Sequence, residues 1–501
     1  MTNKKDTTKH RRPPIVVVVG HIDHGKTTLL DAIRKTKVAE KESGGITQHI
    51  GAYEIEHNGH PITFIDTPGH EAFSKMRGRG AAVADIGILV VAADEGVKPQ
   101  TKEAIATLQE AGIPFLVAMN KIDKPGANID NVKKELSENN IQVESWGGKV
   151  PSIEISAKQG TNLDELLELI LLMSEVEELE AHEGPATGIV IESHRDKFKG
   201  CTATLLILDG VLNKGDFIAV GGMVESVKIL ENFLGKAISS ARYSMPVVLS
   251  GLSDVPEVGE KFQAFSSKKD AEAFAEENKK EIAQRQNILS TIEQSGKPTL
   301  LIVLKSDVSG SKEAIEGLLE KMQYPQAGNV ILKSEVGDVN EADVRTASVA
   351  KNTVIAAFKV KVPGAAKEMA ERNGIKIIQS DIIYDLQELI KTELSHLVQP
   401  EIERTDLGRA KILAIFKKQD SRQIIGGKVT SGKLEKGAMI EIQRGTEAIG
   451  KGKIRELQQM KQTADEVREG FEFGTMVEFS GEIKEGDSLV AYQEEKIYPK
   501  L

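Results

Sequence analysis

Short apolar runs alternate with amphipathic stretches from about residue 13 to residue 183. The runs are rich in β-branched residues, which is typical of strands buried on both faces of a parallel sheet. They are Ile15 to Val19, Ile62 to Ile65, Ile86 to Ala92, Pro114 to Met119 and Ser152 to Ile155. The stretch from Asn162 to Glu180 carries apolar residues every three or four positions, so it predicts a helix that packs on the sheet. Residues 13–183 are therefore expected to form an open α/β domain.

The pattern of apolar positions changes in the rest of the chain. Residues 184–268 and 407–501 show short alternating strands separated by glycine turns, which predict two β-barrels. The turn from Gly210 to Gly215 is echoed by the turn from Gly432 to Gly437, so we expect barrels of one kind. Residues 298–380 alternate strand and helix, and they predict a third, α/β domain without a Gly-Lys phosphate loop of its own.

Three further segments precede or connect these domains. Residues 1–12 are polar and basic without apolar periodicity, which predicts a disordered tail, and residues 269–297 predict a helical linker. Residues 381–406 predict a linker helix, because apolar residues recur at three- and four-residue intervals, at Ile383, Leu386, Ile390, Leu394 and Leu397. That spacing fits a rigid strut to the last barrel and an ordinary helix packed on the third domain equally well. The predicted fold class is multidomain, combining α/β and β domains.

Composition and charge restrict the functions that remain. Cys201 is the only cysteine of the 501 residues, so no intrachain disulfide can form and a reducing, cytoplasmic setting is favoured. The longest apolar run, Ile86 to Ala93, falls far short of the roughly 20 residues that span a bilayer, so we expect no role for the membrane. The net charge of -10 argues against indiscriminate coating of nucleic acid, but residues 409–461 hold 13 Lys or Arg against 5 Asp or Glu. That local balance of +8 predicts contact with RNA at the carboxyl end.

The segment from Gly20 to Thr27 fits the phosphate-loop pattern G-x-x-x-x-G-K-[ST] between a predicted strand and a predicted helix. Backbone amides of such a loop surround the β-phosphate, Lys26 reaches the β- and γ-phosphates, and the Thr27 hydroxyl holds Mg²⁺. The alternative is a glycine turn that binds nothing. The predicted nucleotide contacts here are Gly20, His21, Ile22, Asp23, His24, Gly25, Lys26, Thr27 and Thr28. The first domain is thus expected to be a P-loop domain.

Two later segments complete a guanine-nucleotide site. Asp66-Thr67-Pro68-Gly69-His70 follows the second strand, so Asp66 is expected near Mg²⁺, the Gly69 amide near the γ-phosphate and His70 beside the attacking water. A competing hypothesis makes His21, His24 and His70 a metal cluster. Asn120-Lys121-Ile122-Asp123 follows the fourth strand, and the Asp123 carboxylate can accept two hydrogen bonds from guanine that adenine cannot donate. The loop of Ser156, Ala157 and Lys158 supplies an amide for the guanine oxygen.

The segment from Glu42 to Tyr53 is rich in glycine, and its Thr47 hydroxyl can complete the Mg²⁺ shell only when a γ-phosphate is present. This predicts a nucleotide-dependent switch, and with the motifs above it predicts a GTPase that binds GTP or GDP with Mg²⁺. His70, Asp23 and Lys26 are the candidate catalytic residues, and Thr27, Thr47 and Asp66 the candidate metal ligands.

With these motifs in place, the chain from about Pro13 onward resembles the bacterial translation initiation factor 2 family. The resemblance is carried by Gly20 to Thr27, Ser43 to Tyr53, Asp66 to Phe73 with Met76 to Ala81, and the order of the domains. It implies that Asp23 organises the γ-phosphate region and that Ile22 and Ile46 form an apolar gate. It also implies a cytoplasmic monomer that works with the small and large ribosomal subunits and formyl-methionyl initiator tRNA, with initiation factor 1 as a further candidate partner.

The chain departs from the family in the last barrel, which the resemblance assigns to initiator tRNA. Gly427 and Phe473 stand where the family usually has cysteines that line the formyl-methionyl pocket, beside Gly426 and Gly474. We expect Phe473 either to fill space that the family leaves open or to form a new apolar wall. The chain also begins without the long N-terminal extension of many members, so contacts of that extension are not expected. Two other readings remain open at this point: an elongation-type carrier of aminoacyl-tRNA, and a nucleotide-gated ribosome assembly scaffold.

Overall fold

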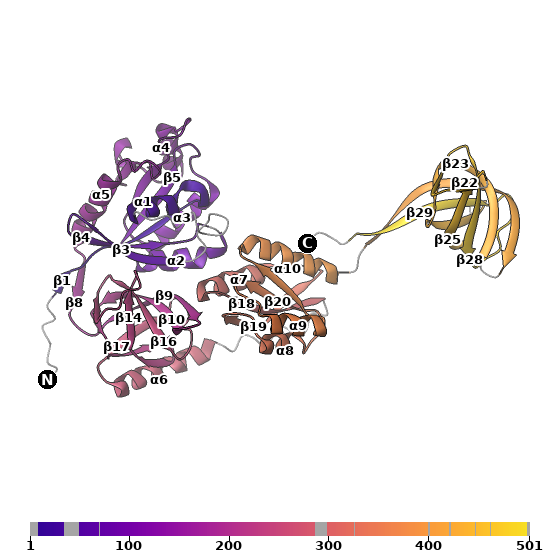
Figure 1. The fold of residues 1–501 in the computed structure, drawn as a ribbon. Helices are drawn as coiled ribbons and strands as arrows, with labels where there is room; N and C mark the ends of the chain where they lie inside the picture. The colour runs from indigo at the N-terminus through magenta and orange to yellow at the C-terminus, as the bar shows by residue number, and fades with distance from the viewer. Residues whose placement is uncertain are drawn as a thin grey trace. The chain divides into compact units, whose positions relative to one another are not determined.

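The computed structural model describes residues 9–34, 50–69, 71–285, 298–324, 326–398, 401–419, 422–445, 447–460 and 462–497. The chain divides into two compact units, Met1–Leu394 and Ser395–Leu501. The first unit contains the predicted P-loop domain, the first barrel and the third domain, and the second unit is the last barrel (Figure 1).

The P-loop domain is built on a six-stranded sheet that is parallel apart from one edge strand. Its order is β3 (Gly51–His57), β4 (His60–Asp66), β2 (Ile15–Gly20), β5 (Ile86–Ala92), β6 (Phe115–Asn120) and β7 (Ser152–Glu154), with β3 antiparallel to β4. All five predicted strands are confirmed. The sheet is flanked by helices α1 (Lys26–Arg34), α2 (Ser74–Val83), α3 (Pro99–Ala111), α4 (Ile129–Glu138) and α5 (Leu163–Val176).

The uninterrupted apolar run of β2 follows from its place in the middle of this sheet. Val17 and Val19 pack in the same core cluster as residues of α3 and α4, whereas Val16 and Val18 pack with residues of α1 and α5. Successive side chains of a strand point to opposite faces, so a strand covered on both faces must be apolar at every position. This burial fixes the position of the loop that follows β2.

The start of the chain is more ordered than its composition indicates. Lys9–Arg11 form strand β1, which pairs antiparallel with β8 (Glu180–His182), and Arg12 donates to Asp85 at 2.7 Å. The prediction of a disordered tail is therefore wrong for residues 9–12, because a strand partner far along the chain and a half-buried ion pair hold them. Residues 1–8 lie outside the described residues.

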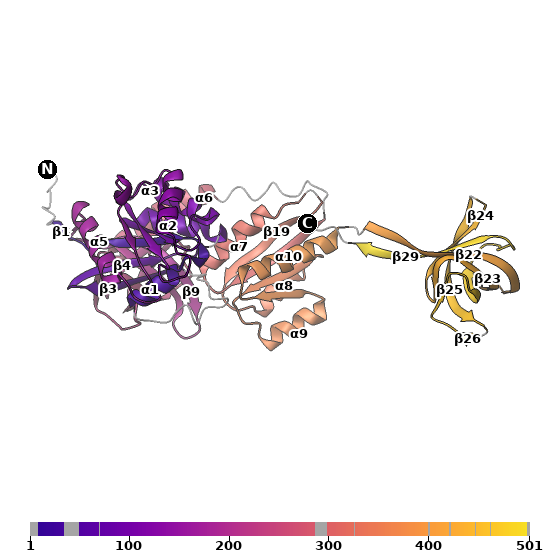
Figure 2. The ribbon, with the colours of Figure 1, turned by 90° about the horizontal axis from the view of Figure 1, so that it is seen from above.

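The two β domains share one strand order. In the first, the order is β13 (Met223–Ser226), β12 (Phe217–Val220), β17 (Lys261–Phe265), β9 (Thr187–Asp196), β10 (Gly200–Asp209), β16 (Pro246–Leu252) and β14 (Ile229–Asn232). In the last, the order is β24 (Met439–Arg444), β29 (Ser488–Ile497), β22 (Glu401–Gln419), β23 (Arg422–Glu435), β28 (Glu472–Phe479) and β25 (Glu447–Gln459). Here β25 pairs with both β24 and β28, so the barrel closes, as Figures 1 and 2 show.

The prediction of two related β domains is confirmed by this order and by their matching turns. Gly210, Gly215, Gly432 and Gly437 all have positive φ, so each echoed turn uses glycine in the same way. The domains differ at one strand, because the single strand β25 corresponds to two short strands, β13 and β14, in the first domain. Helix α6 (Lys268–Arg285) begins the predicted linker, and its Phe274 ring lies 5.5 Å from the Phe265 ring of β17.

The third domain has a parallel sheet of order β19 (Gly328–Val336), β18 (Thr299–Ser306), β20 (Thr353–Phe358) and β21 (Lys376–Ser380). Its helices are α7 (Ser309–Lys321), α8 (Glu341–Ala347), α9 (Gly364–Asn373) and α10 (Ile383–Leu397). Helix α10 buries Ile383, Leu386, Ile390 and Leu394, and Lys376 of β21 pairs with its Glu393. This burial supports the interpretation of α10 as an ordinary helix that packs on the third domain. The predicted linker helix to residue 406 is wrong at its end, because β22 begins at Glu401.

Candidate functional site

The loop between β2 and α1 needs glycine at both ends. Gly20 has φ +148 and Gly25 has φ +88, and a Cβ on Gly25 would lie 2.5 Å from Asn120 Nδ2. Between them, Ile22–His24 form a short 3-10 turn, and α1 begins at Lys26 with its amino end toward the loop. The predicted strand, loop and helix are thus confirmed, and the loop has the form that receives an anion at a helix N-terminus.

Lys26 is held inside this loop. Its side chain is 3% exposed, and its ammonium donates to Gly20 O at 3.0 Å and His21 O at 2.8 Å. Burial lowers the pKa of Lys26 to about 8, and the charges of Asp66 and Asp23 partly offset that effect. An ammonium that is buried against neutral carbonyl groups is well placed to accept an anionic phosphate as a stronger partner.

The Asp66 to Gly69 turn closes on Lys26 from β4. Asp66 is 8% exposed, and a Cβ on Gly69 would collide with Lys26 Nζ and lie 3.0 Å from Ile22 Cα. The half-buried Thr27 hydroxyl follows Lys26 in α1. A carboxylate and a hydroxyl are oxygen ligands of the kind that Mg²⁺ prefers, so Asp66 and Thr27 fit the predicted metal role.

His24 is a structural histidine. It is fully buried, its Nδ1 lies 3.2 Å from Val90 O, and burial lowers its pKa to about 4. The His21 ring lies 5.0 Å away, and burial also lowers the pKa of His21. The described ranges hold no group of three or more His, Cys, Asp or Glu arranged to bind a metal. The histidine-cluster hypothesis also needs His70, which lies outside these ranges, so it stays a prediction.

Asn120 connects the phosphate loop to the base-recognition loop. Its Nδ2 donates to His24 O at 2.9 Å, and its Oδ1 accepts from Ala157 N at 3.0 Å. Asp123 Oδ1 accepts from Ser156 Oγ at 2.6 Å, and that bond lowers the pKa of Asp123. The Asp123 carboxylate therefore stays ionised, as an acceptor of two guanine N–H groups must.

Several residues that position this site lie outside the sequence motifs. Lys121 Nζ donates to Glu95 at 3.1 Å, and Gln100 of α3 accepts from the Ile22 amide at 3.1 Å. Glu95 and Gln100 come from segments that the linear motifs do not include, and no pattern in the sequence distinguishes them. Among the predicted residues, Asp23 and Thr28 are exposed. Ile46, Thr47 and His70 lie outside the described residues, so the gate, the switch threonine and the water-positioning histidine stay predictions.

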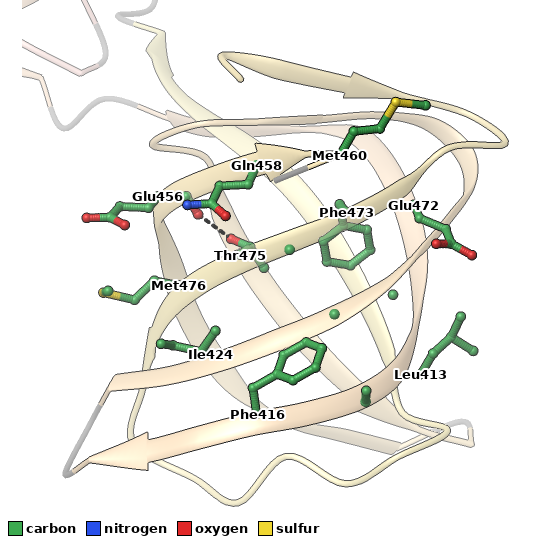
Figure 3. Close-up of a pocket in the computed structure, with 14 residues that line it drawn as sticks. Leu413, Phe416, Ile424, Glu456, Gln458, Met460, Glu472, Phe473, Thr475 and Met476 are labelled. Atoms are coloured by element: carbon green, nitrogen blue, oxygen red, sulfur yellow. Dashed lines mark hydrogen bonds between the residues drawn. The ribbon is translucent and has the colours of Figure 1, made fainter. Parts of the chain in front are cut away.

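The last barrel contains a cavity of about 650 Å³ that is lined by all four residues predicted there (Figure 3). Gly427 of β23 lies opposite Phe473 of β28, and a Cβ on Gly427 would collide with the Lys411 carbonyl oxygen and lie 2.9 Å from two atoms of the Phe473 ring. Phe473 is 4% exposed and belongs to the barrel core. The Phe473 ring therefore occupies space next to the bare Gly427 backbone. The other residues that line the cavity include Phe416, Ile424, Gln458, Glu456 and Glu472.

Basic side chains lie on the two strands beside this cavity. Six exposed cations on β22 and β23 make no ion pair within the part of the chain that the structure describes; they are Arg409, Lys411, Lys417, Lys418, Arg422 and Lys428. By contrast, Arg404 of β22 pairs with Glu441, and Lys433 of β23 pairs with Glu435. Several other cations of the barrel are paired, such as Arg444 with Asp487 at 2.9 Å. The local charge excess is thus concentrated on β22 and β23, where a phosphate backbone would find unpaired partners.

Comparison with known proteins decides the family. Family models match residues 11–175 (elongation factor Tu GTP binding domain), 185–265 (elongation factor G domain 2) and 274–391 (translation-initiation factor 2). The chain is 42% identical over 510 residues to translation initiation factor IF-2 of Clostridium perfringens, which covers 100% of this chain and 75% of that protein. The chain belongs to the translation initiation factor IF-2 family.

A second IF-2, from Alkaliphilus metalliredigens, is 43% identical over 497 residues, covering 97% of this chain and 70% of its own. Among solved structures, GDP-bound aIF5B from Aeropyrum pernix is similar, with a TM-score of 0.52, 30% identity, and coverage of 96% of this chain and 92% of that one. The chain is therefore a GTPase of translation initiation that binds guanine nucleotide. None of the helices in the described ranges has the length and apolarity that crossing a bilayer requires.

Proposed function

We propose that the chain hydrolyses GTP with Mg²⁺ when triggered by the ribosome, after bringing formyl-methionyl initiator tRNA to the small subunit and promoting subunit joining. The observation that carries the nucleotide part is the link through Asn120, which joins the phosphate loop to the loop that keeps Asp123 ionised. Phosphate and base recognition are thereby fixed relative to each other.

Hydrolysis proceeds by in-line attack of water on the γ-phosphorus. Lys26 offsets the charge that develops on the phosphate oxygens, and His70 orients the water. Mg²⁺, held by Thr27, Asp66 and Thr47, supplies further charge neutralisation when bound. Asp23 organises the γ-phosphate region, while Ile22 and Ile46 restrict the access of His70 to water until the ribosome opens that gate.

The catalytic part of the proposal is tested with His70→Ala. The variant should bind GTP normally, because the histidine contacts water and not the nucleotide, and it should lose most ribosome-stimulated cleavage. Single-turnover GTP cleavage measured with and without ribosomes checks both statements. Normal stimulated cleavage by the variant would remove His70 from the mechanism, and fast cleavage without ribosomes would contradict the trigger.

For the tRNA part, we propose that the cavity beside Phe473 holds the acyl group and that the basic strands β22 and β23 hold the acceptor end. Support comes from the apolar lining, the unpaired cations and the family. Competition among formyl-methionyl, unformylated methionyl and deacylated initiator tRNA tests this assignment. Equal binding of formyl-methionyl and deacylated tRNA would refute recognition of the acyl group.

The assembly-scaffold hypothesis gives a different expectation. A scaffold needs the nucleotide to be bound but not cleaved, so abolishing cleavage would leave its cellular role intact. The family membership favours initiation over both the scaffold and the elongation-type carrier. Growth supported by a variant that binds but cannot cleave GTP would favour the scaffold.

A further inference from the structure

A buried arginine lies directly behind the Asp66 to Gly69 turn. Arg77 of α2 is 2% exposed, and its guanidinium donates to Pro68 O at 3.3 Å and to Glu103 of α3 at 3.1 Å. Burial lowers the pKa of Arg77, and the charges of Glu103 and Glu71 oppose that effect. Removing a charged side chain from water is costly unless it is paired and hydrogen-bonded, so this burial requires an explanation.

The carbonyl that Arg77 holds belongs to the peptide group of Gly69. The Pro68 C=O and the Gly69 N–H are parts of one planar trans peptide, and they point in opposite directions. Fixing the carbonyl on the Arg77 side therefore fixes the direction of the amide on the other side. The backbone of Gly69 approaches Lys26 and Ile22 closely, so that amide direction is set at the phosphate loop.

Helix α3 supports both parts of the site from one face. Glu103 anchors Arg77, and Gln100, three residues earlier, accepts the Ile22 amide of the phosphate loop at 3.1 Å. Residues three apart lie on the same side of a helix. One helix face thus holds the phosphate loop and, through Arg77, the turn that faces it.

We propose that Arg77, anchored by Glu103, is a positioning residue that directs the Gly69 amide toward the γ-phosphate and so sets the preference for GTP over GDP. The inference rests on the proposed contact between Gly69 and the γ-phosphate. A purely structural role, in which Arg77 only joins α2 to α3, would affect GTP and GDP binding equally, because GDP uses the same loop.

The experiment measures the affinities of the full chain for GDP and for a non-hydrolysable GTP analogue with Mg²⁺ by titration calorimetry. Arg77→Met should weaken binding of the analogue about tenfold, the size of one lost hydrogen bond to a charged group, and leave GDP binding nearly unchanged. Arg77→Lys should restore part of the loss. Glu103→Gln, at a side chain that is 43% exposed, should shift binding in the same direction with little effect on folding. The exposed Lys75→Met on the same helix is the charge control.

Equal losses for the two ligands, or an unchanged preference in both Arg77→Met and Glu103→Gln, would overturn the inference. Gly69→Ala separates this failure from failure of the γ-phosphate contact itself. If Gly69→Ala weakens analogue binding selectively while the Arg77 and Glu103 variants do not, the contact stands and the positioning role falls. If Gly69→Ala leaves the affinities for both ligands unchanged, the contact itself is wrong and the positioning role falls with it. Equal losses in Gly69→Ala would show that the added Cβ displaces Lys26, and the Arg77→Met and Glu103→Gln variants then decide the positioning role.

Discussion

His24 should make the P-loop domain sensitive to mild acid. The ring is fully buried, its Nδ1 faces Val90 O at 3.2 Å, and its Nε2 has no hydrogen-bond partner within the described ranges. Protonation would place a charge and an unpaired N–H in the interior. Burial accordingly lowers the pKa of His24 from 6.5 to about 4.

The sign and size of the effect follow from proton linkage. Between these two pKa values the unfolded chain binds the proton and the folded chain does not, so the free energy of unfolding falls as the pH drops. The loss begins near pH 6.5 and levels off below about pH 4. At about pH 5 it amounts to roughly 2 kcal/mol relative to about pH 7.5.

Urea unfolding at several pH values measures this loss. Trp146 is the chain's only tryptophan and lies in the P-loop domain, so its fluorescence reports unfolding of that domain. His24→Asn is the matched control, because the asparagine amide can donate to Val90 O without titrating. The wild type should lose about 2 kcal/mol more than the variant over this pH range. Parallel pH profiles for the two proteins would refute the assignment of a buried, neutral His24.

Three further predictions concern the two candidate sites. Asp123→Asn should shift preference from guanosine to xanthosine triphosphate by an order of magnitude or more in a competition assay, since an amide can donate where the carboxylate accepted; unchanged GTP affinity would count against the base assignment. Gly25→Ala should abolish binding of GTP and GDP alike in calorimetry, because its Cβ would lie 2.5 Å from Asn120 Nδ2; normal binding would show that the loop adjusts freely. Gly427→Ala should destabilise the last barrel by about 1–3 kcal/mol in hydrogen exchange, because its Cβ would collide with the Lys411 carbonyl oxygen and press on the Phe473 ring; adding Phe473→Leu should recover only the part due to the ring, and unchanged stability of Gly427→Ala would contradict the close packing.

The sequence predicted the P-loop domain well, because its strands are buried on both faces and every position therefore had to be apolar. Strand β3 was missed for the opposite reason. It is an edge strand whose apolar residues alternate with Glu54 and Glu56, and its first residues fell in the segment interpreted as a switch. The prediction placed the end of the linker helix at residue 406, whereas α10 ends at Leu397. Pro400 follows this end, and a helix does not easily continue through a proline.

The residues of the site also fall into two groups, those that local sequence motifs identify and those that only tertiary contacts identify. The phosphate loop and the base motif are set by short-range chemistry, so their spacing alone placed Lys26 and Asp123. Arg77 and Gln100 act through contacts between separate helices and loops, and nothing in the linear sequence distinguishes them from other helix residues. The meeting of Phe473 with Gly427 likewise depends on the register between two strands, which only the folded barrel defines.

The central claim is that this chain captures a guanine nucleotide through Lys26 and Asp123. Titration calorimetry of the chain with GTP and with ATP, each with Mg²⁺, tests it most directly. The account predicts clear binding of GTP and a loss of several orders of magnitude for ATP, which cannot donate to the Asp123 carboxylate. Equal affinity for the two triphosphates would contradict it.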